Sequence, residues 1–214
     1  LKNIFFKYPY EILKYLFTKT GLFTSTIAEA GAFIKTQDHL EIPNIQFHYA
    51  PAMIVDHGRT LLWGTGMSCH SCLLRPKSLG EVTLESADPF ADPLIDPKFL
   101  SHPDDMKDMI DGYKIMMKVL GTEPFSKYIS DHTMRPIDIN DDSDIEQAMR
   151  EEADTVYHPV GTCKMGDDEM SVVDSRLKVH NMKGLRVVDA SIMPTLVGGN
   201  TNAPTIMIGE KASD

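Results

Sequence analysis

The feature that most constrains the fold is a strand-like run, then a loop rich in Pro and Gly, then a helix at the C-terminal end. The run Leu-Arg-Val-Val-Asp at 185–189 is rich in apolar and β-branched residues, which predicts a buried strand. Thr201 and Asn202 are good N-caps and Pro204 suits a first helical turn, so we expect a helix beginning near Asn202. The apolar run 206–208 predicts that this helix is buried nearly all round. Its N-terminus would present free N–H groups that favour an anion or an electron-rich carbonyl.

Upstream, alternating patterns predict strands. Apolar side chains at Ile45, Phe47 and Tyr49 alternate with polar neighbours, as in a half-buried strand. We expect these strands to form one antiparallel or mixed sheet. Further strand-like runs lie at 60–63, 69–74 and 81–85.

Helical spacing of apolar residues predicts helices outside this sheet. The first carries its apolar residues at 12–17, with Gly21 beyond its end, and we interpret it as a packing helix. The second follows Ser101 or His102 as cap, and its stripe of methionines indicates core packing. The third opens with a capping box at 143–146.

Charge and cysteine content argue against several classes of function. The net charge of −10 disfavours nucleic acid or an anionic membrane surface as partner, and no apolar run approaches the roughly 20 residues that span a bilayer. The three cysteines form no disulfide framework, and Cys69 and Cys72 lie on a strand-like run without a second such pair. A metal-dependent hydrolase built on His48, His57 and His70 stays an alternative, but their spacing matches no ligand pattern, so we assign no metal site.

The chain carries the motif His-Pro-Val-Gly-Thr-Cys-Lys-Met-Gly at 158–166, together with the segments 72–78, 93–97, 184–194 and 199–212. In this order, these segments resemble the C-terminal part of the glucose–methanol–choline (GMC) oxidoreductases, flavoenzymes that oxidise alcohols with FAD. The resemblance covers most of the chain. Within the family, the segments are similar in character to insect members of the glucose dehydrogenase type.

The resemblance implies an α/β chain of the α+β type. Residues 1–155 would form a substrate-binding domain with a largely antiparallel sheet backed by helices. Residues 156–214 would return as a strand, loop and helix that complete the FAD domain. The sequence has no Gly-x-Gly-x-x-Gly after a strand, an element that the family carries in its N-terminal half. We therefore expect a fragment that needs the N-terminal FAD-binding half of the same polypeptide, and that neither binds FAD tightly nor turns over alone.

The resemblance also implies the chemistry. His158 matches the family's base, which accepts the proton of the substrate hydroxyl while a hydride passes to flavin N5. Asn202 matches the second active-site position, where an amide orients the alcohol or stabilises a developing alkoxide. The residues that match the family's cofactor contacts are Asp189, Ala190, Asn202, Ala203, Pro204 and Thr205.

The substrate would be a primary or secondary alcohol, or a sugar, and the sequence does not choose the acceptor that reoxidises the flavin. A catalytically silent or truncated relative that only binds a ligand is the alternative, and the intact His158 and Asn202 argue against it. The resemblance to insect members would imply a secreted protein, although the sequence itself assigns no compartment.

Overall fold

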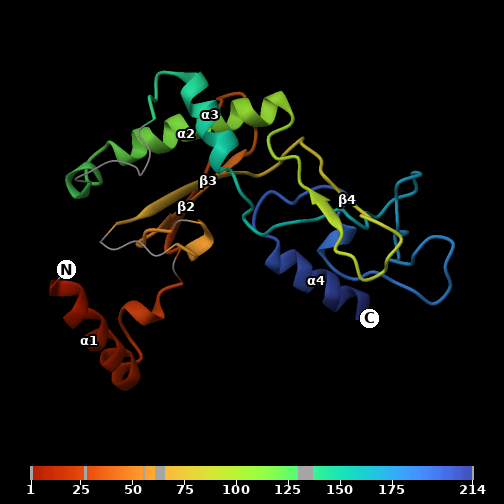
Figure 1. The fold of residues 1–214 in the computed structure, drawn as a ribbon, viewed down its shortest axis with the longest axis horizontal. Helices are drawn as coiled ribbons and strands as arrows, with labels where there is room; N and C mark the ends of the chain where they lie inside the picture. Colours follow the sequence, from red (N-terminus) through yellow and green to blue (C-terminus); the bar gives the residue numbers. More distant parts are fainter. Residues whose placement is uncertain (1, 27, 55, 61–65, 130–136, 214) are drawn as a thin grey trace.

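The computed structural model describes residues 2–26, 28–54, 56–60, 66–129 and 137–213. The fold mixes helices with antiparallel sheets, as the sequence predicts at this level (Figure 1). The helices are α1 (Lys2–Thr18), α2 (Pro103–Leu120), α3 (Asp142–Glu152) and α4 (Asn202–Ser213). The strands are β1 (Ala30–Ile34), β2 (Ile45–Ala50), β3 (Ser68–Leu73), β4 (Glu81–Thr83) and β5 (Leu94–Asp96).

The main sheet is antiparallel with the order β1-β2-β3, and the pairing sets Ile45 opposite Leu73 and His48 opposite His70. The strands predicted over 45–49 and 69–74 are therefore confirmed within one residue at each end. The prediction at 60–63 falls mainly on residues outside the described part of the chain.

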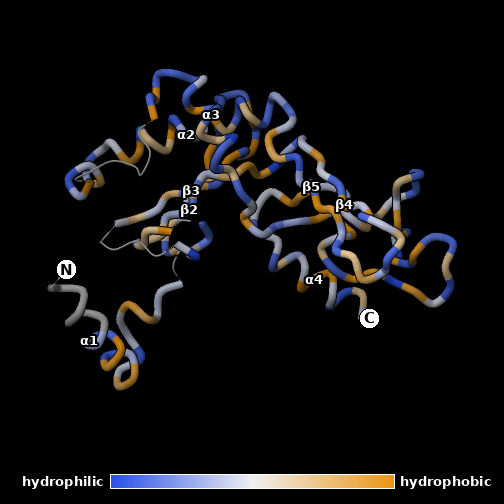
Figure 2. Tube along the Cα trace, viewed as in Figure 1, coloured by the Kyte–Doolittle hydropathy of each residue, from blue (hydrophilic) through white to orange (hydrophobic). Residues whose placement is uncertain are grey.

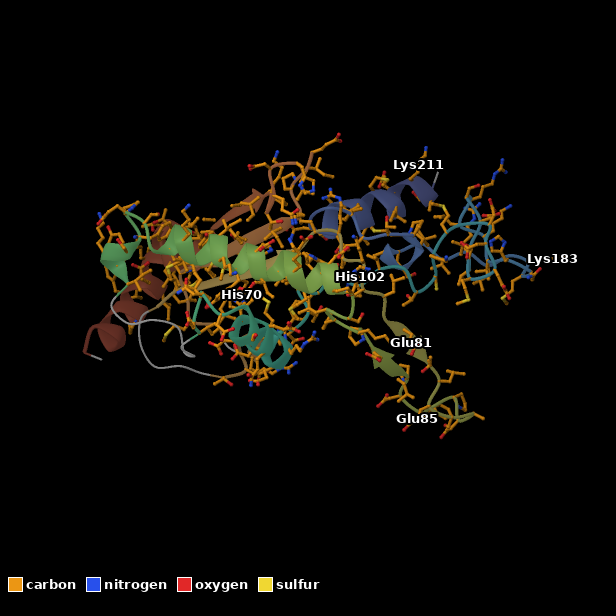
Figure 3. The ribbon with its side chains drawn as sticks, turned by 90° about the horizontal axis from the view of Figure 1, so that it is seen from above. His70, Glu81, Glu85, His102, Lys183 and Lys211 are labelled. Atoms are coloured by element: carbon orange, nitrogen blue, oxygen red, sulfur yellow. The ribbon has the colours of Figure 1, made fainter. Side chains whose placement is uncertain are left out.

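The prediction of a single sheet is wrong, because β4 pairs only with β5 in a separate hairpin. The chain leaves the main sheet after β3, beside the buried carboxylate of Asp105. This carboxylate accepts the backbone N–H of Lys77, at 2.9 Å from Oδ1 and 3.0 Å from Oδ2, and the backbone N–H of Ser78, at 2.7 Å from Oδ2. These bonds turn the backbone away before β4 begins. Figure 3 shows Glu81 and Glu85 on the arm that projects from the body, beyond His102 at the start of α2.

The core lies between α2 and one face of the main sheet (Figure 1). Ile45 and Phe47 are 0% and 1% exposed and pack against Met116 of α2, so the methionine stripe fills the core as predicted. A Cβ at Gly112 would stand 3.1 Å from Ile45 Cγ1, which shows how closely the helix approaches the sheet. His102 caps α2, because its side chain accepts from the N–H of Asp104 at 3.2 Å.

The start of α3 differs from the prediction by one turn or less. Asp141 is the N-cap and accepts from the N–H of Ser143 at 2.9 Å, whereas the capping box placed the cap at Ser143 itself. Asp is as good a cap as Ser, so composition alone did not choose between the two. The helix then buries Ile145 completely against the core beneath α2.

The buried strand predicted at 185–189 is wrong. The segment forms an isolated bridge from Arg186 to Lys178, flanked by two backbone hydrogen bonds between 177–179 and 185–187, and Leu185 is 45% exposed. The segment lies in an irregular layer held by single bridges around Val173, which is fully buried. The run is therefore apolar enough for a strand, but its pairing with 177–179 is too short to form one.

Helix α4 begins at Asn202, as predicted, but it is not buried nearly all round in this chain. Ile206 and Met207 are 63% and 56% exposed, and Ile208 alone among its described residues is buried. Ile208 packs against Ile192 and so fixes α4 to the layer that precedes it.

Helix α1 is a helix as predicted, but none of its described side chains is fully buried or belongs to the core clusters. Leu13 and Phe17 are 54% and 84% exposed, and the helix contacts the short helical turn Leu22–Thr24. Figure 1 shows α1 set apart from the sheet, and Figure 2 shows hydrophobic residues along it. None of the helices in the described part of the chain combines the length and the apolar character that crossing a bilayer requires.

Candidate active site

The face of the main sheet opposite α2 carries the polar side chains. Side chains alternate along a strand, so Gln46 and His48 face away from the core that Ile45 and Phe47 enter. The antiparallel register places Cys72 opposite Gln46, and His70 opposite His48. His70 is labelled on its strand in Figure 3. This set of four side chains, Gln46, His48, His70 and Cys72, is called the polar face below.

Both imidazoles of the polar face are held toward their neutral form. Burial lowers the pKa of His48 below its usual value, and the nearby His158 and His70 lower it further. Burial also lowers the pKa of His70, and the nearby His57 adds to this effect. Neutral imidazoles can both donate and accept hydrogen bonds, so these side chains suit an uncharged polar ligand.

Cys72 lies beside His48, with 3.7 Å between its Sγ and His48 Nε2. Burial raises the pKa of Cys72 to about 11, so the thiol keeps its proton at neutral pH. Cys69 pairs with Tyr49 on the opposite face of the sheet, so the geometry does not bring the two cysteines of the Cys-x-x-Cys together. Within the part of the chain that the structure describes, no group of three or more His, Cys, Asp or Glu side chains is arranged to hold a metal ion.

His158 lies in the irregular segment after α3 and is partly buried. It is near enough to the polar face to contribute, after burial, to the lowered pKa of His48. Burial lowers the pKa of His158, which favours the neutral form that can accept a proton. Beyond it, the N–H of Cys163 donates to the carbonyl of Ser191 at 3.0 Å, and the N–H of Met165 donates to the carbonyl of Ile192 at 2.8 Å.

The loop before α4 is joined to the polar face by one side-chain contact. Gln46 Nε2 donates to Asn200 Oδ1 at 3.3 Å, and Gln46 is only 7% exposed. The next residue, Thr201, is also buried, and its carbonyl accepts from both the N–H of Thr205, at 3.0 Å, and the Thr205 hydroxyl, at 2.7 Å. The first residue of α4, Asn202, is exposed.

The residues matched to cofactor contacts lie on two neighbouring elements. Asp189 caps the short helical turn Ala190–Ile192, where its carboxylate accepts from the N–H of Ser191 at 2.7 Å and from the Ser191 hydroxyl. The other four, Asn202, Ala203, Pro204 and Thr205, form the first turn of α4. The packing of Ile192 against Ile208 brings the two elements together.

Sequence reasoning missed two features of this region. It did not find the link from Gln46 to Asn200, nor the contact between His57 and Asp154 close to His158. The alternation along β2 did place Gln46 and His48 on one face. Their partners come from distant segments, and only the tertiary fold identifies them.

A family model described as GMC oxidoreductase matches residues 76–209. An alcohol dehydrogenase [acceptor] of Pseudomonas putida is 46% identical over 203 residues, which cover 95% of this chain and 37% of the relative. An oxygen-dependent choline dehydrogenase of Klebsiella pneumoniae is 41% identical over 201 residues, which cover 94% of this chain and 36% of the relative.

A solved structure of a formate oxidase variant from Aspergillus oryzae, concerned with modification of its FAD, has a TM-score of 0.86 at 25% identity. The match covers 97% of this chain and 41% of the oxidase chain. The chain thus spans little more than a third of the length of the two curated relatives. The likeness to insect members in particular stays a prediction. Sequence and fold agree that the chain belongs to the GMC oxidoreductases, a family of FAD-dependent flavoproteins.

Proposed function

We propose that this chain supplies the substrate side and the last cofactor contacts of an FAD-dependent oxidoreductase that acts on the CH–OH group of an alcohol or sugar. The observation that carries the proposal is the place of His158 beside the polar face, with a pKa lowered by burial. A neutral imidazole next to neutral hydrogen-bonding groups is suited to take a proton from an uncharged alcohol. Membership of a flavoprotein family supports the redox assignment.

His158 acts as the base in this proposal, because it accepts the hydroxyl proton of the substrate. Asn202 is exposed at the start of α4 and its amide cannot titrate near neutral pH, so it donates a hydrogen bond to the substrate oxygen as negative charge develops there. The link from Gln46 to Asn200 supports the role of Asn202, because it holds the loop that leads into α4 against the polar face.

The first turn of α4 fits the electron-rich edge of a flavin. Pro204 has no N–H, and none of the hydrogen bonds described uses the backbone N–H of Asn202 or Ala203. The helix N-terminus therefore offers two donors and a partial positive charge. The Asp189 carboxylate is engaged with Ser191, and the carbonyls of Asp189 and Ala190 accept the N–H groups of Ile192 and Met193. The backbone N–H groups of 189–190 are therefore the donors that would face the cofactor. FAD, when bound, supplies the acceptor for the hydride that leaves the alcohol carbon.

The division into a substrate-binding domain, residues 1–155, and a C-terminal segment, residues 156–214, belongs to the same proposal. The segment would join the N-terminal FAD-binding half of the same polypeptide, and the 214-residue chain alone would not turn over. The limited coverage of the relatives supports this reading, since both extend well beyond the matched region. Their names, alcohol dehydrogenase and choline dehydrogenase, support a small alcohol as substrate.

The test is an anaerobic titration of the full-length flavoprotein with a panel of primary alcohols, secondary alcohols, sugars and choline, followed by visible absorbance. We expect at least one compound to bleach the oxidised flavin spectrum, with the corresponding carbonyl as product. A full-length protein that contains no flavin, or whose flavin no member of the panel reduces, would contradict the proposal and favour a silent relative that only binds a ligand.

A further inference from the structure

His57 has no part in the proposed chemistry, yet it contacts the turn that leads into His158. Its Nε2 bonds to Asp154 Oδ2, and its ring meets the ring of Tyr157 edge-on with 5.1 Å between centroids. His57 comes from the helical turn Asp56–Gly58, and 97 positions separate it from Asp154 in the sequence. Its side chain is only 19% exposed, although both flanking positions with a side chain, Asp56 and Arg59, are exposed.

The turn from Asp154 to Tyr157 is built by local side-chain bonds. The N–H of Thr155 donates to Asp154 Oδ1 at 2.7 Å, and the N–H of Tyr157 donates to the Thr155 hydroxyl at 2.9 Å. Asp154 therefore uses one carboxylate oxygen for its own turn and the other for His57. Tyr157 has a φ of 64°, in the left-handed region that a bulky side chain occupies only when its surroundings hold it there.

Other support for this turn is sparse. Helix α3 ends at Glu152, and the next backbone bonds to a distant segment begin at Cys163. Among the hydrogen bonds described, the bond from His57 to Asp154 is the one that joins 154–160 to a distant part of the chain. His57 itself has a φ of 53°, so both sides of the contact have left-handed backbones. Strained backbone of this kind concentrates where a functional group must be placed.

We propose that His57 is a positioning residue for His158. Its bond to Asp154 and its contact with Tyr157 hold the turn that sets where the His158 imidazole meets the polar face. The effect of His57 on the pKa of His70 agrees with this placement, because it puts the contact beside the histidines of that face. This inference rests on the proposed function of His158.

Loss of the bond between His57 and Asp154 should change the rate of flavin reduction more than the stability of the fold. The Asp154 side chain is 59% exposed, and an exposed ion pair adds little to folding stability. A small displacement of a base, however, costs about ten- to a hundredfold in rate. Loss of the contact is therefore expected to slow flavin reduction while leaving thermal unfolding nearly unchanged.

The experiment uses the full-length flavoprotein and anaerobic stopped-flow reduction by an alcohol found in the titration. The variants are His57→Ala, Asp154→Ala, the double variant and Asp154→Asn, with His39→Ala as control because His39 lies in an exposed turn away from these contacts. We expect each alanine variant to lower the limiting rate about ten- to a hundredfold, with a smaller change in substrate affinity. The double variant should be no slower than the slower single one, because both remove the same contact.

Asp154→Asn keeps an acceptor oxygen for His57 and should recover most of the rate lost in Asp154→Ala. Additive losses in the double variant, or a His57→Ala rate equal to wild type, would overturn the inference. If His57→Ala does not retain flavin, Asp154→Ala carries the same test at an exposed side chain. A wild-type protein that no alcohol reduces would contradict the proposed function and the inference with it, whereas an active wild type with unaffected variants would overturn the inference alone.

Discussion

Replacing Asp105 should destabilise the protein far more than replacing its neighbour Asp104. Asp105 is 3% exposed, and its carboxylate accepts the backbone N–H groups of Lys77 and Ser78 and the Ser78 hydroxyl, the last at 2.6 Å. The Ser78 hydroxyl oxygen in turn accepts the N–H of His102 at 3.0 Å. An unsatisfied buried donor costs about 1–3 kcal/mol, and water can reach part of this loop, so we expect Asp105→Ala to lower the free energy of unfolding by about 3–5 kcal/mol.

Asp104→Ala is the matched control, because it removes a carboxylate from the same first turn of α2 and so loses the same interaction with the helix dipole. Its carboxylate is 55% exposed and pairs with Lys77 at the surface, so we expect little change. Asp105→Asn keeps one acceptor oxygen and should cost about 1–3 kcal/mol. Urea unfolding of the full-length protein, followed by far-ultraviolet circular dichroism, measures all three. Equal destabilisation by the two alanine variants would refute the view that Asp105 holds the turn after β3.

Two further predictions concern the polar face. Gln46→Leu removes the hydrogen bond to Asn200, a neutral bond worth about 1 kcal/mol. The variant should therefore reduce its flavin about fivefold more slowly in stopped-flow experiments. A rate equal to wild type would show that the bond does not position the loop before α4. Burial raises the pKa of both Cys69 and Cys72 to about 11, so iodoacetamide should label them slowly at neutral pH and faster as the pH rises toward that value. Peptide mass spectrometry measures the labelling, and rapid modification of Cys72 at neutral pH would contradict this account of its surroundings.

Local sequence patterns predict an element well when the spacing of its own apolar residues decides its conformation, without help from a pairing partner. The spacing of apolar residues in α2 and the alternation in β2 both survive in the structure, because each pattern matches the face that packs into the shared core. The run 30–34 carries no such alternation, and β1 was not predicted because its pairing with β2 decides its conformation. The run 185–189 shows the opposite case, in which β-branched residues predict a strand but the pairing with 177–179 stays limited to a single bridge.

In the candidate site too, some residues can be predicted from a local pattern and others are identified only by the tertiary fold. His158 and Asn202 were identified because a long motif resembles a family, and their roles stay predictions. The partners that hold these segments, Gln46 and His57, lie more than 90 positions away from the groups they bond. A contact between two single polar residues so far apart produces no periodic pattern in the sequence. Only the folded chain shows which residues Gln46 and His57 contact.

The role of His158 as base can be tested most directly by the pH dependence of flavin reduction. Burial lowers the pKa of His158 in this chain, so the neutral imidazole should prevail at neutral pH. The limiting rate of anaerobic reduction in the full-length protein should then be constant near neutral pH and fall only as the pH drops through that lowered pKa. His158→Ala should lose this acid limb and be slower by about 10²- to 10⁴-fold at neutral pH. A variant that reduces flavin as fast as wild type, or that keeps the same acid limb, would contradict the assignment of His158 as the base.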